Sequence, residues 1–371
     1  MTMNRRSFFV RSASAIAAGT LLGNRLMEQA IGQTPVTETL YVNVSGADTN
    51  TGTKDKPLKS LAEAAKRVNA SKGKGATTIL LGEGVHALDQ SALFKPERQY
   101  SKTERLTIRA ESLPDDPDWS PQLMPVLIHT MPLSPNWMGG RPDPFGGVAY
   151  GMQLETSHVT VQGVKILGTP HLEQPTAKAI RRVYPIAREG GELDDLEIKQ
   201  CMFLGNREVA ENHCAILARG HGVVVDHCVF YGCKITVVYW SGNAKGCAMR
   251  NTLTHNNYVT GAWVCAIGED FDFSNNVMSG NLSGVLFQGP VKKYNLANSL
   301  FAGNQNLYGA GLGPPVNFKP LDSSVLALPA SSKITDKPIQ IELDQTERNY
   351  LHVGEGTLGS DLGAGLFTKR A

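Results

Sequence analysis

A repeated pattern in the second half of the chain constrains the fold more than any other feature. Asn251, Asn275 and Asn298 stand 24 and 23 residues apart in near-copies of one segment, RNTLTHNN, SNNVMSGN and ANSLFAGN. Earlier copies carry Gln200 and His227 at the same position. A second column follows six residues after each of these positions: Asn206, Cys233, Asn257, Asn281 and Asn304. A fixed period in the twenties with short apolar runs predicts a stacked solenoid.

The alternation of side chains before each repeated position gives the expected strands. Residues two and four places earlier are apolar and should face inward, whereas the residues directly before it should face solvent. Among the latter, Lys199, Asp226 and Arg250 alternate in charge and should pair between neighbouring repeats. Amides in register can hydrogen-bond along such a stack. We therefore expect an all-β fold, a right-handed parallel β-helix with three sheets and a buried asparagine ladder, in which Asn275 is a central member.

Helical spacing is confined to residues 60–69, where Leu61, Ala64, Ala65 and Val68 are apolar. A short amphipathic helix before the first regular strands predicts an N-terminal capping helix over the open end of the solenoid.

The N-terminus has the features of an export signal. Residues 4–9, NRRSFF, resemble the twin-arginine motif, and the apolar run 13–22 is too short to span a bilayer. We expect a signal peptide at 1–32 and a single β-helix domain at 33–371, with no transmembrane segment. The protein should be periplasmic or secreted, and a monomer.

Charge and composition favour a turn-rich β protein. The chain has 38 Gly, 7% aromatic residues and a net charge of +2, and loss of residues 1–32, with four Arg and one Glu, would bring the charge to −1. No nucleic-acid partner is expected at this charge. The six cysteines are interpreted mainly as small buried hydrophobic residues, and a Cys201–Cys228 bridge between adjacent repeats is geometrically possible.

A resemblance to a known family rests on two motifs. The segment GADTNTGTKDKPLKSLAEA resembles the opening of secreted parallel β-helix proteins of the pectate-lyase-like superfamily, and SDLGAGL resembles their closing motif. The matching residues are Gly46, Asp48, Gly52, Thr53, Pro57, Asp361, Gly363 and Ala364. The resemblance covers roughly residues 40–366 and implies a carbohydrate-active enzyme with a polysaccharide substrate, in most cases a polysaccharide lyase or a glycoside hydrolase.

The candidate chemistry is β-elimination on an acidic polysaccharide. A lyase needs a base and a positive group that stabilises the enolate-like intermediate. In relatives the cleft runs along one sheet, and the corresponding region here supplies candidate catalytic and substrate-binding residues. The catalytic candidates are His213, Arg219, Arg188 and Tyr184, with His213 or Tyr184 as the base. The substrate-binding candidates are Arg181, Arg182, Trp240 and Glu211. Ordinary solvated turn charges are the alternative interpretation.

Two other functions remain open at this stage. A glycoside hydrolase would need paired carboxylates; Glu269-Asp270 and Asp194-Asp195 are adjacent residues that should point in opposite directions, so Glu208 and Glu211 are better placed. A non-catalytic glycan-binding β-helix is the second. No acidic cluster suited to Ca²⁺ can be assembled, so no metal ligands are predicted and calcium dependence stays open. Tyr239, Trp263 and Phe287 are expected in one column, with Trp240 facing the other way.

Overall fold

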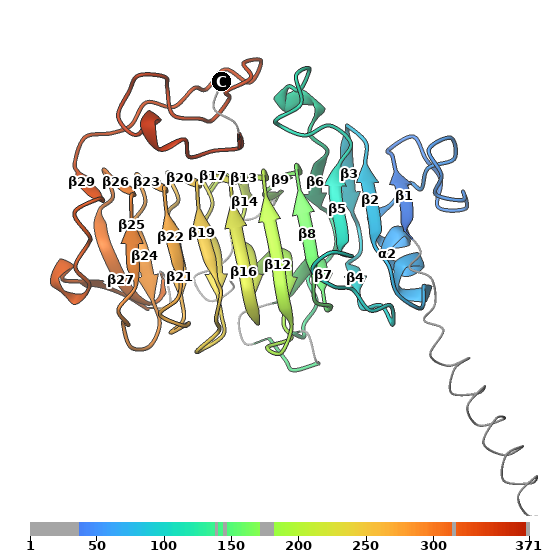
Figure 1. The fold of residues 1–371 in the computed structure, drawn as a ribbon, viewed down its shortest axis with the longest axis horizontal. Coiled ribbons are helices and arrows are strands. Elements are labelled where there is room, and N and C mark those ends of the chain that lie inside the picture. Colours follow the sequence, from blue (N-terminus) through green and yellow to red (C-terminus); the bar gives the residue numbers. More distant parts are fainter. Residues whose placement is uncertain (1–36, 138–139, 144–146, 171–181, 314–316, 369–371) are drawn as a thin grey trace, which may run out of the picture. The chain divides into compact units, whose positions relative to one another are not determined.

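A computed structural model describes residues 37–368, apart from 138–139, 144–146, 171–181 and 314–316. The predicted signal peptide at 1–32 and the substrate-binding candidate Arg181 lie outside the described residues. Within the described part, three long sheets contain nearly all the regular structure, which accords with the expected all-β class (Figure 1). The fold is compatible with a parallel β-helix.

Each sheet has nine strands, and the chain visits the three in turn. Sheet 1 is wholly parallel and consists of β1 (Glu38–Val42), β2 (Thr77–Leu81), β5 (Leu106–Ala110), β8 (Val159–Gln162), β12 (Asp194–Lys199), β16 (His221–Asp226), β19 (Ala248–Arg250), β22 (Asp272–Ser274) and β25 (Asn295–Ala297). Sheet 2, also parallel, consists of β3 (Val85–Leu88), β6 (Val126–His129), β9 (Lys165–Leu167), β13 (Met202–Leu204), β17 (Val229–Tyr231), β20 (Leu253–His255), β23 (Val277–Ser279), β26 (Leu300–Ala302) and β29 (Lys333–Thr335).

Sheet 3 is parallel except for its last strand. It consists of β4 (Ala92–Phe94), β7 (Val148–Leu154), β11 (Arg182–Arg188), β15 (Cys214–Ala218), β18 (Ile235–Tyr239), β21 (Trp263–Val264), β24 (Ser283–Phe287), β27 (Asn306–Gly313) and the antiparallel β28 (Asn317–Leu321). One strand from each sheet in succession forms a repeat unit, here called a rung. Two short strands, β10 (Thr169–Pro170) and β14 (Ala210–Glu211), pair outside the stack.

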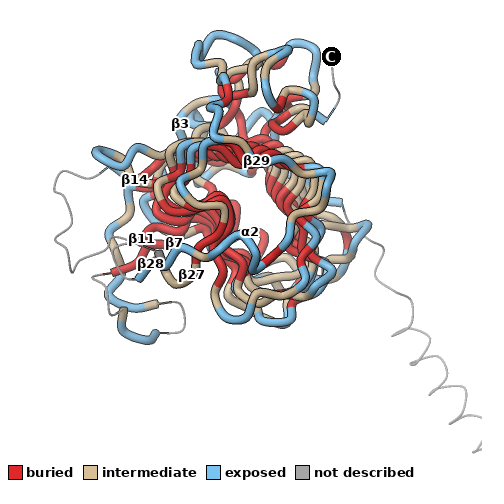
Figure 2. Tube along the Cα trace, turned by 90° about the vertical axis from the view of Figure 1, so that its left-hand side faces the viewer, coloured by how far each residue is buried: buried red, intermediate tan, exposed pale blue. Residues whose placement is uncertain are grey.

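The main core lies between the three sheets, where buried segments run along every rung (Figure 2). The predicted inward columns are confirmed, because all ten side chains are buried: Leu196, Ile198, Val223, Val225, Cys247, Met249, Phe271, Phe273, Tyr294 and Leu296. The register follows from this pattern, since a slip of one residue would bury the charges between them.

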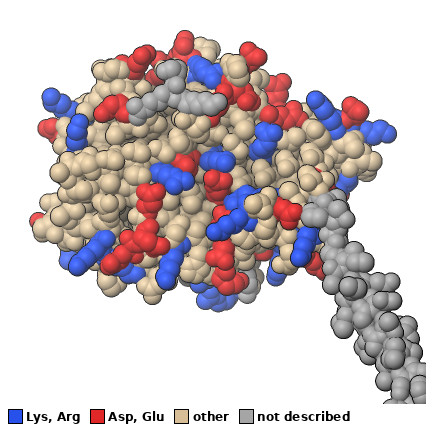
Figure 3. All heavy atoms as spheres, viewed as in Figure 1, with Lys and Arg blue, Asp and Glu red and all other residues tan. Residues whose placement is uncertain are grey.

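Charged side chains of both signs are interspersed on the face shown in Figure 3. The predicted ion-pair column forms only in part: Arg250 pairs with Asp226 at 2.9 Å and with Asp272 at 3.4 Å. Lys199 instead pairs with Glu197 of its own strand, at 3.2 Å.

The turn between sheets 1 and 2 corrects the predicted ladder. Gln200, His227, Asn251, Asn275 and Asn298 all have positive φ, between 44° and 55°. This left-handed conformation is one that asparagine tolerates better than most residues, which explains the repeat. The expectation that Asn275 is buried is wrong: it is half-buried, and its amide donates to Asn251 Oδ1 at 3.2 Å.

The buried polar residues follow one position later. Asn276 is fully buried, accepts a hydrogen bond from the Thr252 backbone at 3.0 Å and donates to the Met249 carbonyl at 2.7 Å. A stronger ladder stands at the next turn, between sheets 2 and 3, where Asn257 and Asn281 are both fully buried. Each turn therefore has a left-handed residue followed by a buried hydrogen-bonding residue.

Helix α2 (Leu61–Ala70) contacts β1, β3 and β4 and buries its apolar stripe in the main core. Ser60 caps its first turn by accepting from the Glu63 backbone at 3.1 Å. Asp48 of the opening motif accepts from the Lys59 and Ser60 backbones at 3.0 and 2.8 Å, and so positions the start of the helix. The conserved-looking motif thus has a structural role at this end of the stack.

The C-terminal residues fold back onto the outer face of sheet 2. Ile339, Leu351 and Leu366 join a second buried cluster with Leu253 and Val277 of that sheet. Arg348 fastens this segment to the loop after β5, because its guanidinium donates to the carbonyls of Pro114, Asp116, Pro117 and Trp119. Three short 3-10 helices occur, η1 (Pro121–Leu123), η2 (Ser323–Val325) and η3 (Ser360–Leu362), and β29 ends the stack.

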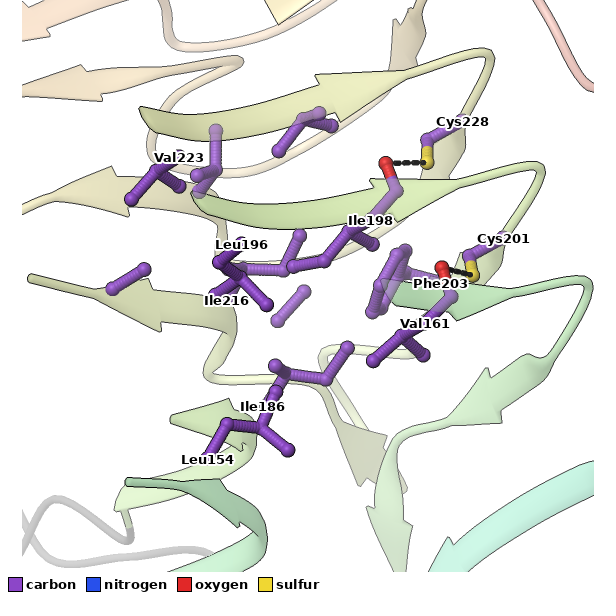
Figure 4. Close-up of a cluster of buried hydrophobic side chains, with 14 of the residues drawn as sticks. Leu154, Val161, Ile186, Leu196, Ile198, Cys201, Phe203, Ile216, Val223 and Cys228 are labelled. Atoms are coloured by element: carbon purple, nitrogen blue, oxygen red, sulfur yellow. Dashed lines mark hydrogen bonds between the residues drawn. The ribbon is translucent and has the colours of Figure 1, made fainter. Parts of the chain in front are cut away.

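All six cysteines are free, and five are buried. The thiol of Cys201 donates to the Val161 carbonyl at 3.7 Å and that of Cys228 to the Ile198 carbonyl at 3.5 Å, in adjacent rungs (Figure 4). They pack as small core residues at the buried turn position, in agreement with the main interpretation of the sequence. Among the described residues, no helix has the length and apolar character needed to cross a membrane.

Candidate functional site

A cavity of about 430 Å³ lies against the outer face of sheet 3. Its floor comes from β11, β15, β18 and β21, and the segment around Trp137 and Pro142 forms one wall. Four aromatic residues line it: Trp137, Tyr184, Trp240 and Trp263. Five further lining residues are basic or imidazole-bearing: Arg141, Arg182, His213, Arg219 and Lys234. We call this the aromatic cavity.

The aromatic residues are fixed by stacking. Tyr184 stacks on Tyr150 with ring centroids 5.6 Å apart and on Trp137 at 6.1 Å, while His213 meets its edge at 5.9 Å. These rings belong to an apolar cluster outside the main core, so the outer face of sheet 3 is unusually hydrophobic here. Flat apolar rings beside charged groups are suited to the faces and substituents of a sugar.

The cations are held at the edges of this apolar surface. The Arg182 guanidinium lies 4.0 Å from the centre of the Trp137 ring and pairs with Asp143. Arg219 pairs with Glu189 at 3.8 Å, and its Nε has no hydrogen-bond partner among the described residues. Arginine on a site of this kind binds carboxylate through two parallel hydrogen bonds.

His213 is placed in the wall of the cavity just before β15 and is 7% exposed. Burial, together with repulsion from Lys234 and Arg182, lowers its pKa well below 6.5. The imidazole is therefore neutral at pH 7, and its Nδ1 has no partner in the described part of the chain. A neutral, unengaged imidazole nitrogen is the state that a general base requires.

Lys234 is a candidate that the sequence reasoning missed. It occupies the rung after His213, is 7% exposed and lies 3.9 Å from Glu211. Burial lowers its pKa, and the attraction of Glu211 offsets this only in part. Glu211 also accepts a hydrogen bond from the Tyr258 hydroxyl, and it lines a neighbouring cavity rather than the aromatic one. The signal in the sequence was a lysine between apolar residues immediately before a strand, aligned with His213.

Arg188 does not line the aromatic cavity, although the sequence made it a catalytic candidate. Its side chain is fully buried, and Nε donates to the Arg219 carbonyl at 2.7 Å. The other two nitrogens reach the carbonyls of Asp194 and His221, both at 3.2 Å. The guanidinium thus joins backbone groups of consecutive rungs, and burial is the main cause that lowers its pKa to about 10.

The aromatic column differs from expectation by one residue. Trp263 pairs with Val238 and Leu286 on the outer face, whereas Tyr239 aligns with Val264 and Phe287 in the core. Trp240 is 37% exposed at the mouth of the cavity, and its ring meets the edge of Trp263 at 5.7 Å. The indole nitrogen of Trp263 is buried without a hydrogen-bond partner in the described residues, so it can donate to a bound molecule.

The carboxylates weighed for hydrolysis do not assemble in this cavity. Asp195 bonds to Arg105 at 2.5 Å and to His158 at 2.9 Å on sheet 1. Glu269 and Asp270 are exposed at a turn. Of the described residues that line the aromatic cavity, only Glu189 carries a carboxylate. The same described residues contain no group of three or more His, Cys, Asp or Glu side chains arranged to hold a metal ion.

The chain matches no family model, and comparison with curated proteins finds no match. Three solved structures are similar in fold. A rhamnogalacturonan lyase has a TM-score of 0.49 and 13% identity, over 72% of this chain and 69% of that one. A GH136 lacto-N-biosidase from Eubacterium ramulus has a TM-score of 0.45 and 12% identity, over 74% and 55%. The PL6 family alginate lyase AlyGC has a TM-score of 0.26 and 11% identity, over 89% and 57%. Because each TM-score is below 0.5, the chemistry rests on the side chains of the cavity.

Proposed function

We propose that the protein is a carbohydrate-active enzyme that cleaves an acidic polysaccharide by β-elimination. The observation that carries this proposal is the aromatic cavity, where Arg182, Arg219 and Lys234 surround stacked aromatic rings. The rings suit sugar faces, and the cations suit the carboxylate of a uronate residue. A positive environment also stabilises the charge that develops on that carboxylate when the neighbouring proton is removed.

His213 is the proposed base. It removes the proton on the carbon next to the carboxylate, and the electron pair of that C–H bond forms a carbon–carbon double bond. The bond from the adjacent carbon to the glycosidic oxygen breaks, and the leaving oxygen takes a proton from the Tyr184 hydroxyl. Burial is the main cause that raises the pKa of Tyr184 far above its usual range, so the phenol remains protonated as an acid requires.

Hydrolysis is the less favoured reaction for this site. Glycoside hydrolases of the usual kind need two carboxyl groups on either side of the scissile bond. Glu189 is the one carboxylate in the described lining of the aromatic cavity, and it pairs with Arg219. Glycan binding without turnover requires the same aromatic and cationic groups but no neutral base, and the lowered pKa of His213 favours catalysis.

The proposal includes the finer features of fold and location. The three parallel sheets form a right-handed β-helix, α2 caps its first rung, and residues 1–32 direct export as a twin-arginine signal. Periplasmic or secreted location would bring the enzyme to an extracellular polysaccharide. Replacing Arg5 and Arg6 together with Lys tests the signal, because cleavage and appearance of the protein outside the cytoplasm should be lost.

The decisive experiment is to incubate the protein with a panel of uronate polymers and follow the ultraviolet absorbance of an unsaturated uronate. His213→Gln should lower the rate by about 10²- to 10⁴-fold. His221→Gln is the matched control, because His221 is exposed on sheet 1 and does not line the aromatic cavity, so its rate should not change. New reducing ends without this absorbance would identify a hydrolase, and binding without either product would identify a non-catalytic protein.

A further inference from the structure

A second cavity, of about 380 Å³, adjoins the aromatic one and shares His213 as a wall. Its other side chains come from the end of β6, from β10 and β14, and from the segment that follows β6. The residues on which its chemistry depends are His129, His213, Thr169 and Glu211. We call this the histidine cavity.

Its polar atoms are unusually unengaged for their burial. His129 is 1% exposed, yet neither ring nitrogen has a hydrogen-bond partner among the described residues. The same holds for Nδ1 of His213 and Oγ1 of Thr169. Buried polar groups in proteins are almost always hydrogen-bonded, so a cluster of such atoms around one cavity indicates a bound partner. The volume is within the range of small-molecule sites.

The position of the His129 ring is fixed by the backbone beside it. A Cβ placed on Gly151 would lie 2.1 Å from His129 Nε2, so the ring packs directly against this glycine of β7. A side chain held in this way is already ordered before a ligand arrives, which lowers the entropic cost of binding.

The charge of the histidine cavity differs from that of the aromatic cavity. Among the described residues that line it, none is Lys or Arg. Burial lowers the pKa of His129 to about 4 and that of His213 well below 6.5, so both rings are neutral. A neutral imidazole offers one donor and one acceptor, and a hydroxyl group can satisfy either. Glu211 is already engaged by Tyr258 and Lys234.

We infer that the histidine cavity binds a neutral, hydroxyl-bearing sugar residue adjacent to the acidic residue held in the aromatic cavity. Because His213 separates the two, one chain could occupy both, with the bond to be cleaved close to this residue. The substrate would then be a heteropolysaccharide that contains uncharged as well as uronate residues. This inference rests on the proposed function for the identity of the acidic neighbour.

The test measures binding rather than turnover. The full chain is titrated with galactose, glucose, mannose and xylose, and separately with galacturonate and glucuronate, by calorimetry. At least one neutral sugar should bind, and a saturating uronate should not displace it. His129→Phe, which keeps a ring but removes both nitrogens, should weaken the neutral sugar by about tenfold or more and leave uronate affinity unchanged.

Thr169→Val provides a second variant that removes a hydroxyl at nearly constant volume. It should weaken the same neutral sugar, whereas Thr107→Val on β5 of sheet 1 is the matched control and should have no effect. If His129→Phe does not fold, perturbation of the His129 ring signals by the neutral sugar in the nuclear magnetic resonance spectrum of the unmodified protein takes its place.

Each outcome decides between the alternatives. Binding of no neutral sugar, competition between neutral sugar and uronate for one site, or unchanged affinity in both variants would overturn the second site. Failure of the proposed function has a different signature, namely no uronate binding and no unsaturated product, and it leaves the neutral-sugar titrations readable on their own.

Discussion

The side-chain amide of Asn281 joins three consecutive rungs. Its nitrogen donates to Asn304 Oδ1 at 2.9 Å, and its oxygen accepts from both the backbone and the side-chain nitrogen of Asn257, at 3.0 and 2.9 Å. Asn281 and Asn257 are fully buried, so water cannot replace these bonds. A single amide in this column therefore satisfies polar groups above and below it.

Asn281→Leu should destabilise the fold by about 1–3 kcal/mol for each buried group that loses its partner, including the Asn257 backbone nitrogen. Because stability in a solenoid is shared between neighbouring repeats, the loss should centre on the adjacent rungs. Denaturant melts measure the change. The control is Asn275→Gly, at a half-buried position with φ of 55°, which keeps the left-handed turn and should cost less. A larger loss for Asn275→Gly would show that the half-buried amides hold the stack.

The acidic member of the ion-pair column gives a prediction about pH. Burial alone would raise the pKa of Asp226, but hydrogen bonds from His227, Asn251 and Arg250 outweigh it and lower the pKa to about 2. A carboxyl with a depressed pKa in the folded state contributes stability that is present above its unfolded pKa, about 3.9. That contribution, roughly 2 kcal/mol, should disappear as the pH falls from about 4 to about 2.

Arg250→Ala tests this assignment, because it removes one of the three donors. At pH 7 it should cost less than about 1 kcal/mol, since the Arg250 side chain is 38% exposed. The acid transition of the variant should move to higher pH. Identical acid melts for the two proteins would mean that Asp226 does not control stability in this range.

The sequence predicted the stacking and the inward columns because apolar alternation leaves only one register that buries no charge, as at Ile198 and Val225. It placed the ladder one residue early, since the asparagine repeat reports the left-handed backbone at Asn275 rather than the buried position of Asn276. Both residues are asparagine in that rung, and the sequence alone cannot tell which amide is enclosed.

The aromatic column was wrong because of one extra residue in a turn. Tyr231 pairs with His255, 24 residues later, but Ile235 pairs with Thr260, 25 residues later. The added residue shifts Trp263 to the outer face, where it lines the aromatic cavity. A constant period, which the prediction assumed, cannot reveal an insertion that is compensated before the next sheet 1 strand.

Part of the site was also accessible from sequence, because Tyr184, Arg182, His213, Arg219 and Trp240 all line the aromatic cavity. Arg188 differs only in the direction of its side chain at the end of β11, and Lys234 only in the strand that follows it. Such distinctions depend on bends within sheet 3 that no local pattern encodes.

The pH dependence of catalysis follows from the environment of His213. Because its pKa is well below 6.5, the base is already deprotonated at neutral pH, and protonation removes activity only on further acidification. We expect kcat/KM to stay level from pH 7 down to pH 6 and to fall in more acidic solution. Lys234→Gln removes one of the charges that depress this pKa, so the acid limb of the variant should move to higher pH. An acid limb at the same pH in both proteins would exclude His213 as the titrating base.

Trp240 should contribute to substrate binding rather than to the chemical step. Its ring is 37% exposed at the mouth of the aromatic cavity and stands edge-on to Trp263, so a sugar can stack on it without rearrangement. Trp240→Ala should weaken binding of uronate oligosaccharides by about 0.5–1.5 kcal/mol and raise KM by the corresponding factor, with kcat little changed. Leu343→Ala, at another exposed apolar residue that does not line this cavity, is the matched control. A fall in kcat at unchanged KM would instead place Trp240 against the reacting atoms, and oligosaccharides bound equally by both variants would remove it from the site.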